Sequence, residues 1–278
     1  RSYPAPAISP PTPSPARAQH AKTQESWTLR ASDLMLRVGG DVVFRDVHFE
    51  APRHGVVAVV GGSGSGKTSL LLALAGRMRL TEGVIDIGTH RLHAPKSTQA
   101  ELRAVRSAVA VGRIADLVGL DPELTLHRNV SDAADWVNVK RSVAREHFED
   151  WWDTLGFEID AHARVSELPA IERAVAHLVL ATLGEPEVIV FDDVARGLQV
   201  AERRQIWPIF RKIADSGPVV IGATLDELTL EADVVVRLSR IRARHAASEV
   251  ASETESEPEL ETQTKPETEP QIDTEEER

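Results

Sequence analysis

The sequence predicts an α/β fold with a mainly parallel β-sheet covered by helices. Two observations support this prediction: short β-branched runs alternate with longer helical patterns, and several of the short runs are apolar at every position. A continuously apolar strand is typical of a sheet buried on both faces, and parallel strands need helical crossovers between them. With 278 residues, of which 42% are apolar, the chain is long enough to bury a substantial core.

The predicted strands are bounded by glycine, proline or charged residues. They lie at residues 56–60, 84–87, 108–111, 188–191, 219–221 and 234–236. The predicted helices carry apolar residues at helical spacing and lie at residues 67–79, 141–155, 171–183 and 202–214. The alternation of the two kinds of segment favours an α/β arrangement over separate all-α and all-β parts.

The two ends of the chain differ in composition from the part between them. Six prolines lie within residues 4–15, and residues 246–278 hold 12 acidic residues against two basic ones. Such segments bury too little apolar surface to offset the entropy of ordering them. We therefore expect a disordered head at 1–26, a folded domain at 27–245 and a disordered acidic tail at 246–278, for which a solubilising role is favoured over a partner-binding role.

Composition excludes several classes of function. The chain has no cysteine, which removes disulfides, thiolate catalysis and zinc–thiolate sites. Ten of the eleven net negative charges belong to residues 246–278, so the rest of the chain is nearly neutral and lacks the basic face of a nucleic-acid-binding protein. No apolar run approaches the roughly 18 residues of a membrane helix. His177 is interpreted as a surface or hydrogen-bonded histidine and not as a metal ligand.

A glycine-rich stretch follows the first predicted strand. Residues 61–68 read GGSGSGKT and fit the phosphate-loop pattern G-x-x-x-x-G-K-[ST] between a strand and a helix, the context that the motif requires. Backbone N–H groups of such a loop wrap phosphate oxygens, Lys67 neutralises the β- and γ-phosphates, and Thr68 can bind Mg²⁺. The predicted nucleotide-binding residues are Gly61, Gly62, Ser63, Gly64, Ser65, Gly66, Lys67, Thr68 and Ser69.

Two carboxylates end the apolar run at 188–191. Asp192 is predicted to complete the magnesium site with Thr68, because a phosphate loop needs a carboxylate on a neighbouring strand. Asp193 is predicted to polarise the attacking water, so Asp193 and Lys67 are the expected catalytic residues. The competing interpretation is an acidic strand end that only faces solvent.

These motifs occur in a sequence that resembles the nucleotide-binding domains of ATP-binding cassette (ABC) proteins, which power membrane transporters. The resemblance covers roughly residues 29–238. It rests on DVVFRDVHFEAPRHGVVAVVGGSGSGKTSLLLALAGRMRLTEGVIDIG upstream, on DPELTLHRNV, and on ELPAIERAVAHLVLATLGEPEVIVFDDVARGL downstream. It implies a P-loop NTPase fold of ABC type, with an N-terminal antiparallel β portion and a small helical subdomain at about residues 117–170.

The resemblance also shows where this chain departs from the family pattern at the hydrolytic positions. The glutamine of the loop that senses magnesium falls at Asp116, which is predicted as a further metal ligand. The catalytic glutamate falls at Asp193, whose carboxylate is one methylene shorter, and the switch histidine falls at Leu225, which cannot hydrogen-bond a phosphate. Slow hydrolysis is therefore expected.

Two further departures concern the partner's site and the nucleotide base. The family signature LSGGQ reads LPAIE at residues 168–172, where Pro169 lacks an N–H and Ile171 adds bulk in place of glycine. The tyrosine that stacks on adenine aligns near Val38, and the only tyrosine of the chain is Tyr3. Adenine is expected to be held without that ring.

Four aromatic residues are expected to lie in the helical subdomain: Phe148, Trp136, Trp151 and Trp152. Aromatic side chains are favoured as anchors at interfaces, and in the family this subdomain contacts the transmembrane partner. The alternative, ordinary core packing of a small subdomain, is favoured. Trp151 and Trp152 are adjacent and point to different faces of their helix, so at least one of these two rings is expected at the surface.

The preferred interpretation is an ATP-binding subunit of an ABC-type transporter or membrane complex that binds MgATP and hydrolyses it slowly. It would associate with a separately encoded transmembrane protein, form a homo- or heterodimer of ATP-binding domains, and lie on the cytoplasmic face of the membrane. The alternative is a non-hydrolysing nucleotide-sensing or scaffolding subunit. A soluble ABC protein acting on nucleic acid or ribosomes is a third, less favoured interpretation, and no nucleic-acid partner is expected.

Overall fold

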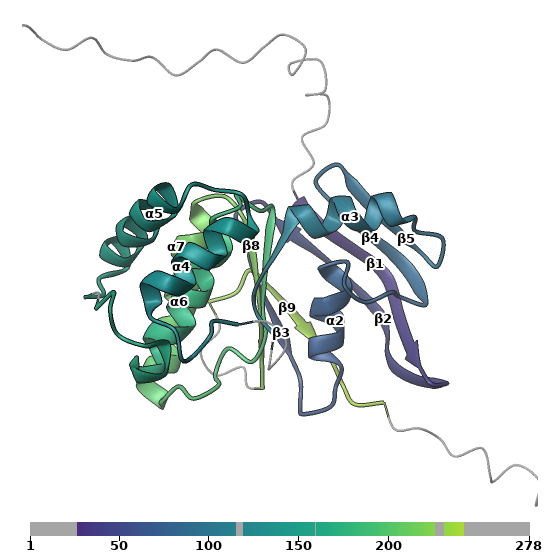
Figure 1. The fold of residues 1–278 in the computed structure, drawn as a ribbon. Helices are drawn as coiled ribbons and strands as arrows, with labels where there is room; N and C mark the ends of the chain where they lie inside the picture. Colours follow the sequence, from purple (N-terminus) through teal and green to yellow (C-terminus); the bar gives the residue numbers. More distant parts are fainter. Residues whose placement is uncertain (1–26, 115–118, 159, 226–230, 242–278) are drawn as a thin grey trace, which may run out of the picture. The chain divides into compact units, whose positions relative to one another are not determined.

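The computed structural model describes residues 27–241 except for 115–118, 159 and 226–230 (Figure 1). Five parallel strands form one sheet in the order β6-β7-β8-β3-β9. Their bounds are β3 (Val56–Val60), β6 (Val109–Arg113), β7 (Val188–Phe191), β8 (Val219–Thr224) and β9 (Val234–Arg237). A second, antiparallel sheet has the order β2-β1-β4-β5, with β1 (Trp27–Val38), β2 (Asp41–Pro52), β4 (Glu82–Ile87) and β5 (His90–Ala94).

Helices cover both faces of the parallel sheet. They are α2 (Lys67–Leu74), α3 (Gln99–Ala108), α4 (Leu126–Trp136), α5 (Arg141–Leu155), α6 (Ala170–Thr182) and α7 (Val200–Asp215), with a short 3₁₀ helix at Val165–Glu167. In Figure 1, α4 to α7 lie on one side of this sheet, and α2, α3 and the antiparallel sheet lie on the other. None of the helices in the described part of the chain is long and apolar enough to cross a membrane.

The central strands are apolar throughout because each one supplies two cores. Alternate side chains of β3 point to opposite faces, so Val56 and Ala58 pack with α4 to α7, whereas Val57 and Val59 pack with α2 and the antiparallel sheet. All five residues of β3 are buried. The continuous apolar runs of the sequence therefore correspond to strands with no solvent-facing side, and the predicted α/β fold is confirmed.

One predicted segment needs correction, and another is present but lies in the second sheet. The helix predicted at 67–79 ends at Leu74, because the N–H groups of Arg77 and Met78 both turn back to the carbonyl of Leu72 and Gly76 adopts a φ of 64°. The predicted strand at 84–87 belongs to the antiparallel sheet and not to the parallel one. This places it in the antiparallel β portion that the family resemblance implies.

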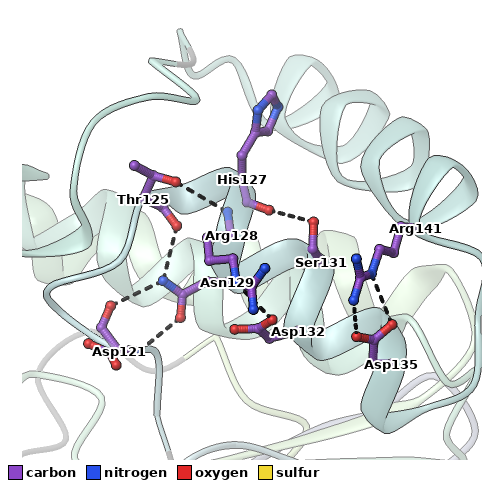
Figure 2. Close-up of polar contacts among 9 residues, drawn as sticks. All are labelled: Asp121, Thr125, His127, Arg128, Asn129, Ser131, Asp132, Asp135 and Arg141. Carbon is purple, nitrogen blue, oxygen red and sulfur yellow. Dashed lines mark hydrogen bonds and ion pairs between the residues drawn. The ribbon is translucent and has the colours of Figure 1, made fainter.

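A buried asparagine organises the start of the helical region. Asn129 of α4 is 6% exposed, and its side-chain amide donates to the carbonyls of Asp121 and Thr125 at 3.1 and 3.2 Å. Its side-chain oxygen accepts the N–H of Asp121 at 2.8 Å (Figure 2). Thr125 caps α4 by accepting the N–H of Arg128. These bonds give the 121–125 segment a fixed path into α4.

Candidate functional site

The glycine-rich loop connects β3 to α2 as the sequence predicts. The N–H of Gly61 donates to the carbonyl of Thr224 on β8, which fixes the start of the loop at the carboxyl end of the sheet. A side chain at Gly61 would collide with the carbonyl of Leu238, and Gly66 precedes α2 with a φ of 93°. Both positions therefore require glycine. Residues 62–64 are exposed at the tip of the loop, and Ser65 is buried.

Lys67 lies along this loop. Its ammonium donates to the carbonyls of Gly61 at 2.6 Å and Gly62 at 3.0 Å. Partial burial lowers the pKa of Lys67, and the carboxylates of Asp192 and Asp193 act in the opposite direction. The loop carbonyls thus hold the ammonium in place, and the negative charges of Asp192 and Asp193 act on it.

Thr68 and Asp192 meet across the strand edge. Strand β8 lies between β3 and β7, and the three strands are parallel, so the loop after β3 and the residues after β7 reach the same edge of the sheet. The Thr68 hydroxyl donates to Oδ2 of Asp192 at 2.6 Å, and Asp192 is 3% exposed. A hydroxyl and a carboxylate are oxygen ligands that fit Mg²⁺, which keeps several waters and takes only one or two protein carboxylates.

Asp193 adopts a left-handed backbone conformation directly after Asp192. Its φ is 49°, its N–H donates to Oδ1 of Asp192 at 2.9 Å, and its carbonyl accepts the N–H of Arg196 at 2.9 Å. Aspartate tolerates this conformation better than most residues do. The half-buried Asp193 therefore sits in a defined turn next to the candidate metal site. The remaining predicted metal ligand, Asp116, lies outside the described residues.

Sequence reasoning missed Arg113, the last residue of β6. Its guanidinium is buried beside the Asp192–Asp193 turn, donates to the carbonyls of both aspartates and lies 4.6 Å from the centre of the Phe191 ring. Burial lowers the pKa of Arg113 to about 10, so the group stays charged at neutral pH. A signal existed in the sequence, because a basic residue lies two positions after the apolar run at 108–111, close to the carboxyl edge where Asp192 is expected.

The segment that aligns with the family signature leads into α6. Pro169 is the exposed N-cap of α6, and the guanidinium of Arg173 donates to the carbonyl of Leu168. Ile171 is 7% exposed and packs in the core on the α4–α7 side of the sheet. Its bulk therefore points inward, a detail that the sequence comparison alone did not indicate. Burial raises the pKa of Glu172, the last residue of the segment.

The other positions singled out in the sequence lie at strand ends or on helices. Leu225 directly follows β8 and is 57% exposed, and Val38 ends β1 and is 56% exposed. Tyr3 lies outside the described residues. His177 lies against the ring of Phe191, and burial, with Arg113 and Arg173 adding to it, lowers the pKa of His177 to about 3.

The four aromatic residues of the helical region separate into buried and exposed members. Phe148 and Trp152 are buried and stacked, with ring centres 5.0 Å apart. Trp151 is half-buried and packs against the same core, whereas Trp136 is 89% exposed at the end of α4. Core packing therefore explains Phe148 and Trp152, Trp151 is the member of the adjacent pair that is partly exposed, and Trp136 is the most exposed ring of the four.

A phosphate loop between β3 and α2, joined to a carboxylate at the end of β7, together with a flanking antiparallel sheet and a helical region, defines an ATP-binding cassette. The family model for ABC transporters matches residues 44–196, more than half of the chain. The chain belongs to the ABC transporter family.

Curated relatives and solved structures agree with this assignment. The ribose import ATP-binding protein RbsA of Chelativorans sp. (strain BNC1) is 27% identical over 223 residues, covering 76% of this chain and 42% of RbsA. The molybdenum import ATP-binding protein ModC of Brucella suis biovar 1 (strain 1330) is 28% identical over 205 residues, covering 72% of this chain and 55% of ModC. The chain thus spans about half the length of these relatives.

Two solved structures share the fold at low sequence identity. The cassette cbiO1 from Clostridium perfringens, part of the ABC transporter complex cbiONQ, superposes with a TM-score of 0.63 at 16% identity, covering 78% of this chain and 88% of cbiO1. The ATP-binding cassette MJ0796, a dimer bound to ADP and Pi, superposes with a TM-score of 0.61 at 18% identity, covering 77% and 97% of the two chains.

Proposed function

We propose that this chain is the ATP-binding subunit of an ABC-type transporter and that it binds MgATP where the phosphate loop meets Asp192. One observation carries the proposal: Thr68 and Asp192, 124 residues apart in sequence, are joined by a 2.6 Å hydrogen bond beside Lys67. The names of the curated relatives, both import ATP-binding proteins, support a role in import. Because one relative is named for ribose and the other for molybdenum, we propose no transported substrate.

The loop would hold the triphosphate mainly through charge and backbone N–H groups. The exposed tip at 62–64 and the N-terminus of α2, which includes Ser69, present N–H groups to an anion. The Lys67 ammonium, now bonded to loop carbonyls, would neutralise the β- and γ-phosphates. Thr68 and Asp192, with Asp116 as a further candidate, would hold Mg²⁺. A Mg²⁺ ion held by these residues would supply positive charge to offset the negative charge that develops in phosphoryl transfer.

We propose that hydrolysis is slow. Asp193 is the candidate general base, and its side chain is one methylene shorter than the glutamate at this position of the family, which shortens the reach of the carboxylate. Leu225, at the position of the family's switch histidine, offers no hydrogen bond to a phosphate. Water attack on the γ-phosphate would therefore depend mainly on charge stabilisation by Lys67 and the loop.

Restoring the family residues tests this explanation of slow turnover. The double variant Asp193→Glu with Leu225→His is expected to raise steady-state phosphate release by about tenfold or more, because a correctly placed base contributes at least that factor. Each single variant is expected to give less. Phosphate release is measured at saturating MgATP, with thermal unfolding as a check on folding.

A matched control keeps the test specific. The variant Asp215→Glu makes the same chemical change at the end of α7, outside the nucleotide site, and is expected to leave turnover unchanged. An unchanged rate in the double variant would show that other positions, such as the LPAIE segment, limit hydrolysis.

Association with a separately encoded transmembrane protein at the cytoplasmic face of the membrane, and pairing with a second ATP-binding domain, are part of the proposal. The relatives are named as import ATP-binding proteins, the solved cassette cbiO1 is part of a transporter complex, and the solved cassette MJ0796 is a dimer. Purification in mild detergent from membranes tests the first: a transmembrane protein should co-purify stoichiometrically, and MgATP hydrolysis should be measured with and without it. Calorimetric MgATP binding with no hydrolysis in either state would favour the sensing alternative.

A further inference from the structure

Arg113 is tied to the candidate metal site by both its backbone and its side chain. In the parallel pairing of β6 with β7, Arg113 lies opposite Phe191, the residue that precedes Asp192. Its carbonyl accepts the N–H of Asp192 at 2.8 Å. The Arg113 side chain also reaches the turn formed by Asp192 and Asp193, where it donates hydrogen bonds to both carbonyls.

The guanidinium contacts main-chain atoms of the two aspartates. Nη2 donates to the carbonyl of Asp192 at 3.3 Å and to the carbonyl of Asp193, and Nε lies 3.4 Å from the Asp192 carbonyl. Within the described residues, no hydrogen bond or ion pair joins this guanidinium to either carboxylate. Both carboxylates therefore remain available to Thr68, Lys67 or a cation, while a positive charge stays beside them.

This charge is permanent and shielded from bulk water. Arg113 is 9% exposed, one side of its guanidinium faces the Phe191 ring, and an arginine keeps its proton throughout the physiological pH range. Its field also acts on Asp192 and Asp193, and the guanidinium groups of Arg173 and Arg196 lie close enough to influence it. A fixed positive charge in a partly buried site attracts phosphate oxygens. It also repels a divalent cation and so weakens the binding of that cation to the neighbouring carboxylate.

We propose that Arg113 is an internal cation of the nucleotide site, which supports ATP binding without Mg²⁺ and weakens the dependence of binding on the metal. This inference rests on the proposed MgATP site. A merely structural role, in which Arg113 only clamps the Asp192–Asp193 turn, would change stability without changing the metal dependence. The two roles are therefore separable by measurement.

The test is calorimetric titration of ATP into the full chain, once with Mg²⁺ and once with EDTA, and the readout is the ratio of the two affinities. Arg113→Gln is expected to raise this ratio about tenfold, which corresponds to about 1.4 kcal/mol. Arg113→Lys, which keeps the charge but loses the forked donors, is expected to stay close to wild type. The control is Arg128→Gln, which removes an exposed charge paired with Asp132 on α4 (Figure 2) and should leave the ratio unchanged.

Each outcome decides the question. A wild-type chain that binds no MgATP refutes the proposed function and this inference together. A wild-type chain that binds MgATP but loses more than about 100-fold of its affinity in EDTA overturns the inference alone, and needs no variant that might fold poorly. An unchanged ratio in Arg113→Gln, or a lysine variant that behaves like the glutamine variant, overturns it as well.

Discussion

Replacement of Lys67 by alanine is expected to weaken MgATP binding about 100-fold and to leave the fold intact. The ammonium lies on the phosphate loop, bonded to the carbonyls of Gly61 and Gly62 at 2.6 and 3.0 Å, where it can turn to a bound triphosphate. A hydrogen bond between charged groups in a partly buried site contributes about 3 kcal/mol, or about two orders of magnitude in affinity. The half-buried side chain holds no core residue in place, so thermal unfolding should change little.

A second lysine provides the control for this experiment. Lys96 is exposed and follows β5, outside the phosphate loop, so Lys96→Ala removes the same group from the surface. Calorimetric titration with MgATP should separate the two variants clearly. Wild-type affinity for MgATP in Lys67→Ala would show that the loop does not bind the triphosphate, and it would refute the proposed function.

The parts of the fold that sequence predicts best are those with a single physical explanation. The runs at 56–60 and 188–191 are apolar at every position because both of their faces are buried, and the structure places both as strands with the predicted bounds. The helix at 141–155 is equally well defined, since Gly156 stops it in a left-handed conformation. The glycine-rich loop was identifiable for the same reason, because its backbone requires glycine at fixed positions.

Other helices and strands are harder to predict because their sequence patterns are short or mix apolar and polar positions. Helix α3 (Gln99–Ala108) was not predicted, although Thr98 and Glu101 form a capping box that the sequence displays. The long antiparallel strands β1 and β2 carry mixed exposed and buried positions, so only the family resemblance implied them. Helix α2 was predicted too long because apolar residues continue past its last turn, whereas Gly76 ends the helical backbone.

The site residues that belong to short sequence motifs could be predicted, whereas those that depend on contacts between distant parts of the chain could not. Lys67, Thr68 and Asp192 each belong to a short motif, and the parallel sheet then brings the motifs together. Arg113 contacts main-chain carbonyls 79 and 80 residues away, and a basic residue after an apolar run does not by itself identify these carbonyls as its partners. The orientation of Ile171 likewise follows from the packing of α6 on the sheet, which a motif comparison does not contain.

Replacement of Trp152 by alanine is expected to lower the free energy of unfolding by about 3–5 kcal/mol. Trp152 is fully buried, stacks on Phe148 with ring centres 5.0 Å apart and contacts Phe157 at 5.3 Å, so alanine would leave a large cavity between α5 and its neighbours. Urea unfolding followed by circular dichroism measures the loss. The variant Trp136→Ala is the matched control, because the same truncation at an 89% exposed ring should change stability by no more than about 0.5 kcal/mol.

A third variant at residue 152 separates the contribution of ring packing from the cost of burying the indole N–H. Within the described residues, the indole N–H of Trp152 is buried without a hydrogen-bond partner. An unpaired buried donor costs about 1–3 kcal/mol, so Trp152→Phe, which removes the N–H and keeps most of the ring, should lose far less stability than Trp152→Ala. If Trp152→Phe and Trp152→Ala lower the free energy of unfolding equally, the indole N–H has a hydrogen-bond partner, such as water. Tryptophan would then be required at this position for that hydrogen bond as well as for its packing.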